Sequence, residues 1–187
     1  MSTNTTLAER AMFFVKNIRQ PFVNASVVPS SATAARSMLE DIDFSKIKTI
    51  VELGPGTGPY TAELIKRASR NSTIILIELD PDYAALLRRK FGDRVIVENV
   101  GAERLGEVLR RHSIERPDLI VSALPFAPRK QMQALFKSIK NYTDQGTIFR
   151  FEIIFRPTAY PVYEVLPIQK RKYVWRNFPP MWVYGIN

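Results

Sequence analysis

The residues best suited to chemistry form a glycine-rich turn at residues 54–58, which reads G-P-G-T-G. The turn follows the apolar run Ile50–Leu53 and precedes a helix-like segment. Because glycine has no Cβ, a ligand can approach the backbone closely at such a turn. A helix that begins there also presents N–H groups to the ligand. The pattern predicts a ligand site at the carboxyl edge of an α/β sheet.

Two acidic residues near the turn indicate which class of ligand the site binds. Glu78 lies 20 residues after Gly58, at the end of a second apolar run, where a carboxylate can accept hydrogen bonds from both ribose hydroxyls. A nicotinamide dinucleotide would fit this arrangement too, but the glycine pattern is not G-x-G-x-x-G. Glu52 also precedes the turn by two residues. Its charge suits a sulfonium amino acid with an ammonium group better than a pyrophosphate.

Alternating elements must position these residues. Short apolar runs rich in Ile and Val predict buried parallel strands, and amphipathic runs between them predict helices. The predicted strands are Ile47–Leu53, Thr73–Leu79, Arg94–Glu98, Asp118–Ala123 and Thr147–Phe155, and the predicted helices are Tyr60–Arg70, Tyr83–Phe91, Arg104–His112 and Arg129–Ile139. This order predicts an α/β fold with a mostly parallel sheet and helices on both faces.

Two segments lie outside this alternation. Near the C-terminus, Tyr173–Phe178 and Trp182–Ile186 flank two prolines and predict an antiparallel hairpin at the sheet edge. At the N-terminus, apolar residues recur at helical spacing from Leu7 to Phe22 and predict an amphipathic helix. That helix packs on its own domain or lies in a membrane interface. Ser30 or Ser31 could cap the helix that follows.

Composition narrows the partners. The net charge is +9, from 27 Lys and Arg against 18 Asp and Glu, which favours nucleic acid or an anionic membrane surface. The chain has no Cys, and its one His is His112, which we expect to be solvated. We therefore expect no metal site and no Ser-His-Asp triad. No apolar run is long enough to span a bilayer and no signal peptide is visible, so we expect a cytoplasmic protein, peripheral at the inner membrane surface.

The motifs resemble those of a known class of enzymes. Residues 52–58 match the first motif of class I S-adenosylmethionine-dependent methyltransferases, and residues 77–80 match the second. The resemblance implies a Rossmann-like fold and S-adenosyl-L-methionine as the cofactor. It implies cofactor contacts by Glu52, Gly54, Gly56, Gly58, Glu78, Leu79, Gly101, Ala102 and Ser122. One departure is Gly101, where this class often carries the Asp that bonds the adenine; backbone groups at residues 101 and 102, or Glu103, are the alternatives.

Leu124, Pro125 and Phe126 follow the fourth strand and are the candidate catalytic residues. With them, the pattern is similar to two groups of methyltransferases, the ribosomal RNA adenine dimethyltransferases and the bacterial phospholipid N-methyltransferases. Apolar residues at this point would desolvate an amine and favour its neutral form, and an aromatic face would stabilise a cation.

Three features favour the lipid group. Ala123 stands where the RNA enzymes carry an Asn that holds the adenine amine, Trp175–Pro180 resembles the end of the lipid enzymes, and the N-terminal segment resembles their opening. The sequence therefore predicts N-methylation of a membrane aminophospholipid such as phosphatidylethanolamine, with RNA adenine N6 as the alternative. We expect residues 1–45 to hold the amphipathic helix and a lid over the cofactor, and residues 46–187 to hold the methyltransferase unit. The expected substrate and membrane contacts are Ser30, Phe14, Lys16, Arg19 and Tyr160.

Overall fold

A central sheet organises the protein. The computed structural model describes residues 32–124, 129–153, 166–175 and 180–187. Within these residues seven strands form one sheet in the order β3-β2-β1-β4-β5-β7-β6. The strands are β1 (Thr49–Leu53), β2 (Thr73–Ile77), β3 (Ile96–Glu98), β4 (Leu119–Ser122), β5 (Ile148–Ile153), β6 (Gln169–Val174) and β7 (Met181–Ile186).

The first five strands are parallel, and of the two C-terminal strands only β7 reverses direction. β7 runs antiparallel to β5, and β6 runs antiparallel to β7 at the sheet edge. The predicted mostly parallel α/β fold with a C-terminal antiparallel hairpin is confirmed. The first hairpin strand begins at Gln169, four residues before the predicted start at Tyr173, because its charged residues lie on an exposed edge and hide the strand pattern.

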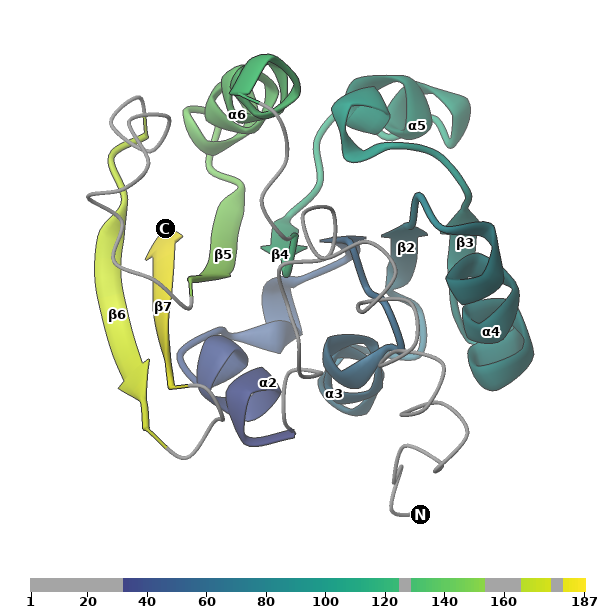
Figure 1. Ribbon diagram of the computed structural model, residues 1–187, viewed down its shortest axis with the longest axis horizontal. Coiled ribbons are helices and arrows are strands. Elements are labelled where there is room, and N and C mark those ends of the chain that lie inside the picture. Colours follow the sequence, from purple (N-terminus) through teal and green to yellow (C-terminus); the bar gives the residue numbers. More distant parts are fainter. Residues whose placement is uncertain (1–31, 125–128, 154–165, 176–179) are drawn as a thin grey trace.

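Helices cover both faces of the sheet, as predicted. α2 (Ala32–Leu39), α3 (Pro59–Arg67) and α4 (Pro81–Phe91) contribute to one face, and α5 (Leu105–Arg111) and α6 (Arg129–Thr143) lie on the other (Figure 1). Short 3-10 turns complete the connections: η1 (Phe44–Lys46), η2 (Gly92–Arg94) and η3 (Ala102–Arg104). Neighbouring strand residues alternate between the two sides: Ile50 packs with α2 and α3, whereas Val51 packs with α5 and α6.

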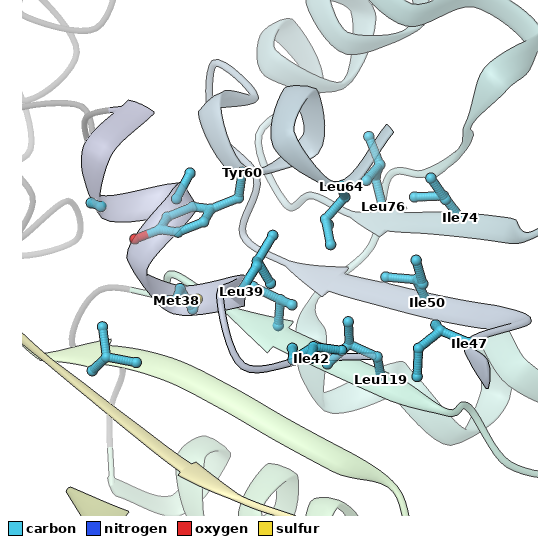
Figure 2. Close-up of a cluster of buried hydrophobic side chains, with 14 of the residues drawn as sticks. Met38, Leu39, Ile42, Ile47, Ile50, Tyr60, Leu64, Ile74, Leu76 and Leu119 are labelled. Carbon is cyan, nitrogen blue, oxygen red and sulfur yellow. The ribbon is translucent and has the colours of Figure 1, made fainter. Parts of the chain in front are cut away.

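The cluster beneath α2 and α3 fixes the start of α3, which follows the glycine turn. Met38, Leu39 and Leu64 are fully buried there, and the ring of Tyr60 lies among them (Figure 2). Each such apolar side chain contributes roughly 1.5–3 kcal/mol when fully buried. Since α2 belongs to this cluster, the C-terminal part of the region 1–45 is integral to the domain. The predicted amphipathic helix at residues 7–22 lies outside the described residues.

Arg150 ties α2 to the sheet. Its guanidinium is 1% exposed and donates to the Ile186 carbonyl at 2.9 Å, to the Asn187 side chain at 2.7 Å and to Asp41 at 3.1 Å. The Nη1 and Nη2 groups make all of these hydrogen bonds, and the buried Nε has no partner in the described part of the chain. These contacts hold the segment after α2, strand β5 and the last residues of β7 together.

No helix in the described ranges is long and apolar enough to cross a bilayer, and no three His, Cys, Asp or Glu side chains gather in them as a metal site. His112 is not the solvated residue that the sequence suggested. Its Nε2 lies 2.7 Å from Oε1 of Glu98, and its side chain is 24% exposed, because the end of α5 packs against β3.

Candidate functional site

The glycine turn joins β1 to α3 and has left-handed backbone at three positions. The φ angles are +68° at Gly54, +55° at Gly56 and +82° at Gly58, a region that costs a residue with a Cβ roughly 1–2 kcal/mol. A Cβ at Gly54 would lie 2.7 Å from the Leu124 side chain, and one at Gly58 would lie 2.6 Å from the Phe91 ring. At Gly56 no described atom lies within 4 Å of that position. The turn is thus closely packed at both ends and open in the middle.

Glu78 holds the open part of the turn. Its Oε2 accepts a hydrogen bond from the Gly56 N–H at 2.9 Å, and its Oε1 accepts one from the Asp80 N–H at 2.9 Å. Burial raises the pKa of Glu78, although these backbone hydrogen bonds oppose the rise. A carboxylate has about four lone-pair sites. Two backbone donors therefore leave Glu78 able to accept hydrogen bonds from ribose hydroxyls.

Asn99 fixes the segment that follows β2, a role that the sequence did not reveal. Its side-chain amide donates to the carbonyl of Glu78 at 2.8 Å and to that of Leu79 at 3.0 Å. Leu79 keeps its side chain 68% exposed. Asp80 then caps α4 by accepting hydrogen bonds from the N–H groups of Asp82 and Tyr83. This cap was recognisable, since Asp followed by Pro is typical of a helix start. The exposed Leu79 could pack against an adenine ring.

Glu52 lies behind the turn and is sealed from solvent. Its Oε2 accepts a hydrogen bond from the Thr61 hydroxyl at 2.7 Å, and its Oε1 has no hydrogen-bond partner in the described part of the chain. Burial, together with the nearby Glu78 charge, raises the pKa of Glu52 to about 8. Glu52 is therefore largely protonated at pH 7 in the ligand-free protein. Its predicted contact with a cofactor ammonium stays a prediction.

At the end of β3, the carboxylate is that of Glu103, which lies two residues after Gly101, the position where the resemblance led us to expect an Asp. Gly101 is buried and precedes η3, and the Glu103 carboxylate lies where a Cβ at Gly101 would be placed. Ala102 packs against the core beneath α5 and α6. Of the alternatives left open by the sequence, Glu103 brings a carboxylate to this position, whereas Gly101 and Ala102 offer only backbone groups.

The fourth strand brings the predicted acceptor segment to the turn. Ser122 is buried, its Oγ accepts a 3.4 Å hydrogen bond from the Leu124 N–H, and the Leu124 side chain lies against Gly54. The ends of β1, β2 and β4 therefore meet at one edge of the sheet. The other predicted residues of this set lie outside the described residues: Pro125, Phe126, Ser30, Phe14, Lys16, Arg19 and Tyr160.

Comparison with known proteins places this site in a family. The family model described as ribosomal RNA adenine dimethylase matches residues 30–150. The chain belongs to this family of S-adenosylmethionine-dependent methyltransferases. An ornithine lipid N-methyltransferase of Singulisphaera acidiphila is 30% identical to the methyltransferase over 179 residues, which cover 92% of this chain and 93% of the relative.

Ribosomal RNA small subunit methyltransferases A are similar over a shorter stretch. The protein of Acidobacterium capsulatum is 36% identical over 99 residues, which cover 51% of this chain and 33% of the relative. The protein of Ralstonia nicotianae is 43% identical over 121 residues, which cover 64% of this chain and 42% of the relative. The methyltransferase thus spans less than half the length of these ribosomal relatives.

Solved structures support the fold. An O-methyltransferase from Bacillus cereus in complex with S-adenosylhomocysteine has a TM-score of 0.63 at 14% identity and covers 97% of this chain and 91% of its own. Fibrillarin from Aeropyrum pernix with natively bound S-adenosylmethionine has a TM-score of 0.59 at 16% identity. The match covers 83% of this chain and 73% of the fibrillarin chain. These structures share the fold of the methyltransferase, and its use of S-adenosylmethionine follows from the family to which it belongs.

Two glycine substitutions should separate ligand binding from folding. Gly56→Ala meets no described atom and carries only the left-handed backbone cost of roughly 1–2 kcal/mol, but its methyl group enters the open space beside Glu78. We expect it to weaken S-adenosylhomocysteine binding at least ~10-fold in calorimetry. Gly58→Ala must displace Phe91 and should lose more of the free energy of unfolding, roughly 2–4 kcal/mol, in urea titrations. Tight binding by Gly56→Ala would place the cofactor elsewhere.

The protonated Glu52 predicts an unusual pH dependence of stability. Between the ordinary carboxyl pKa of 4.5 and the raised value of about 8, the unfolded chain loses the proton and the folded protein keeps it. The free energy of unfolding should therefore fall as pH rises through this window, with a contribution of roughly 3–5 kcal/mol from this residue. Glu52→Gln, which keeps an acceptor for Thr61, should show a flatter urea-unfolding profile from pH 5 to 8. Parallel profiles for the two proteins would contradict the assignment.

Proposed function

We propose that the protein transfers a methyl group from S-adenosylmethionine to the amine of a membrane-lipid headgroup, such as that of phosphatidylethanolamine or an ornithine lipid. One observation carries this proposal. The similarity to the ornithine lipid N-methyltransferase extends over nearly the full length of both proteins, whereas the ribosomal relatives match over less than half of theirs. The Ala at position 123, which offers no side-chain acceptor for an adenine amine, supports the same choice.

The proposed cofactor contacts follow the strand ends. Gly54, Gly56 and Gly58 let the ligand approach the backbone, Glu78 accepts hydrogen bonds from the ribose, and Leu79 packs against the adenine. The third-strand segment, with Gly101, Ala102 and the Glu103 carboxylate, borders the adenine edge. Glu52 supports the glycine turn from its buried side, and Ser122 supports the segment that follows β4.

The bound cofactor supplies an activated methyl group on a positively charged sulfur. The protein must align the amine with that methyl group and exclude water. An alkyl amine is protonated in water at neutral pH, with a pKa near ~10, and only its neutral form attacks. Leu124 lies against the turn and would form part of a dry acceptor site, and we propose that Pro125 and Phe126 complete it.

The C-terminal hairpin supports docking on an anionic membrane. Trp175 is 67% exposed and Tyr173 is 44% exposed, while the Lys170 ammonium lies 3.4 Å from the centroid of the Trp182 ring. Residues 167–187 contain four basic residues and no acid. Trp and Tyr favour the membrane interface, and basic residues favour anionic headgroups. We propose that this surface and the predicted amphipathic N-terminal helix, with Phe14 on its apolar stripe and Lys16 and Arg19 beside it, hold the enzyme on the membrane.

RNA remains the second candidate, because the matching family model is that of an RNA adenine dimethylase and the positive charge suits any polyanion. A labelling experiment decides between the two. The full-length protein is incubated with radiolabelled S-adenosylmethionine and either aminolipid vesicles or total RNA. We expect label in the lipid headgroup nitrogen, increasing with the fraction of anionic lipid and decreasing with salt.

Vesicles whose lipids carry no amine serve as the matched control and should stay unlabelled. Methylated headgroups should appear in mass spectra of the lipid product. Label at adenine N6 of RNA, with the aminolipid unlabelled, would overturn the proposal and favour the RNA reading.

A further inference from the structure

A carboxylate lies beside the acceptor segment on the neighbouring strand. β5 runs parallel to β4 with Phe151 paired to Ser122, so Glu152 is level with Ala123, the first residue after β4. Strands in a sheet are about 4.8 Å apart. Glu152 therefore lies at the carboxyl edge of the sheet, next to the position where the RNA enzymes carry the amide that holds their substrate amine.

The sheet register also fixes which way Glu152 points. Its neighbour Phe151 packs into the core beneath α5 and α6, so Glu152 faces the opposite side, toward α3. Ala123 packs on that same side, as does Val183, the β7 partner of Glu152. The small side chain of Ala123 and the carboxylate of Glu152 are thus neighbours on one face.

Tyr60 orients this carboxylate. The Tyr60 hydroxyl, at the start of α3, donates a hydrogen bond to Oε2 of Glu152. The Tyr60 ring is 1% exposed and is held in the packed cluster beside Met38 (Figure 2). A hydrogen bond from a rigidly held phenol fixes the direction in which the carboxylate points. Glu152 itself is only partly buried, so part of its side chain is open to solvent at this edge of the sheet.

We propose that Glu152, oriented by Tyr60, binds the protonated amine of the acceptor and removes its proton before methyl transfer. The inference rests on the proposed function, because it assumes an alkyl amine substrate. The ammonium gives one proton to the carboxylate, and the freed nitrogen lone pair forms a bond to the methyl carbon. The carbon–sulfur bond breaks with its electron pair left on sulfur, so the positive charge passes from sulfur to nitrogen.

This assignment explains how the site can work without the amide at position 123. An adenine amine is neutral and is held well by an amide, whereas an alkyl ammonium carries a charge and a proton that must leave. A carboxylate can pair with the charge of the ammonium and can also accept its proton. Glu152 is therefore a specificity-determining residue for a cationic amine as well as the proposed base.

Matched variants test the proposal on the full-length protein with aminolipid vesicles. Glu152→Gln keeps the shape and an acceptor for Tyr60 but loses the charge, and should lower kcat/KM at least ~100-fold. Tyr60→Phe breaks the same hydrogen bond but keeps the carboxylate, and should lower kcat/KM less than ~10-fold. Glu152→Asp should recover part of the loss. Urea unfolding and S-adenosylhomocysteine affinity of Glu152→Gln should match the unaltered protein.

The outcomes separate this inference from the proposed function. If the unaltered protein labels aminolipid and Glu152→Gln labels it equally well, or if Tyr60→Phe loses as much activity as Glu152→Gln, the role of Glu152 is overturned while lipid methylation stands. If the unaltered protein labels RNA and no lipid, the role of Glu152 and the proposed lipid methylation are both overturned.

A measurement on the unaltered protein guards against a variant that fails to fold. Phosphoethanolamine should inhibit lipid methylation at least ~10-fold more strongly than 2-hydroxyethyl phosphate, which has a hydroxyl in place of the ammonium. Equal inhibition by the two compounds would overturn the proposed ammonium site.

Discussion

The hydrogen bond between the Gly56 N–H and the Glu78 carboxylate is the interaction on which the site depends. It joins the turn after β1 to the end of β2, and it forms only because the turn has the left-handed backbone that glycine allows. Asn99 secures the same segment from the end of β3. Three strand ends are thereby locked together, and α3 and α4 begin at fixed positions on either side of the open Gly56.

The carboxyl edge of the sheet divides into two halves. The ends of β1, β2 and β3 carry hydrogen-bond acceptors and the open space at Gly56, where we propose that the cofactor binds. The ends of β4 and β5 carry Leu124, Ala123 and Glu152, where we propose that the methyl acceptor binds. Tyr60 connects the two halves, since it begins the helix that follows the glycine turn and its hydroxyl reaches β5.

Local sequence signals predicted most of the fold, and they predicted the glycine turn and Glu78 at the ends of β1 and β2. The glycine turn, the acid after β2 and the alternating apolar runs each depend on residues close in sequence, and all three predicted their elements correctly. The pairing of Tyr60 with Glu152 spans 92 residues and has no local signal. Neither does the contact of His112 with Glu98. These depend on strand register and helix packing, which a single sequence does not encode as a pattern.

We propose that Glu78 binds the cofactor ribose, and a double-mutant cycle tests this contact most directly. Calorimetry would compare the unaltered protein and Glu78→Ala, each with S-adenosylhomocysteine and with an analogue that lacks both ribose hydroxyls. Any disturbance of the turn cancels in this cycle. We predict that Glu78→Ala loses about 2–3 kcal/mol, roughly 30- to 150-fold, for S-adenosylhomocysteine and far less for the analogue. An equal loss for both ligands, or no loss for either, would contradict the account.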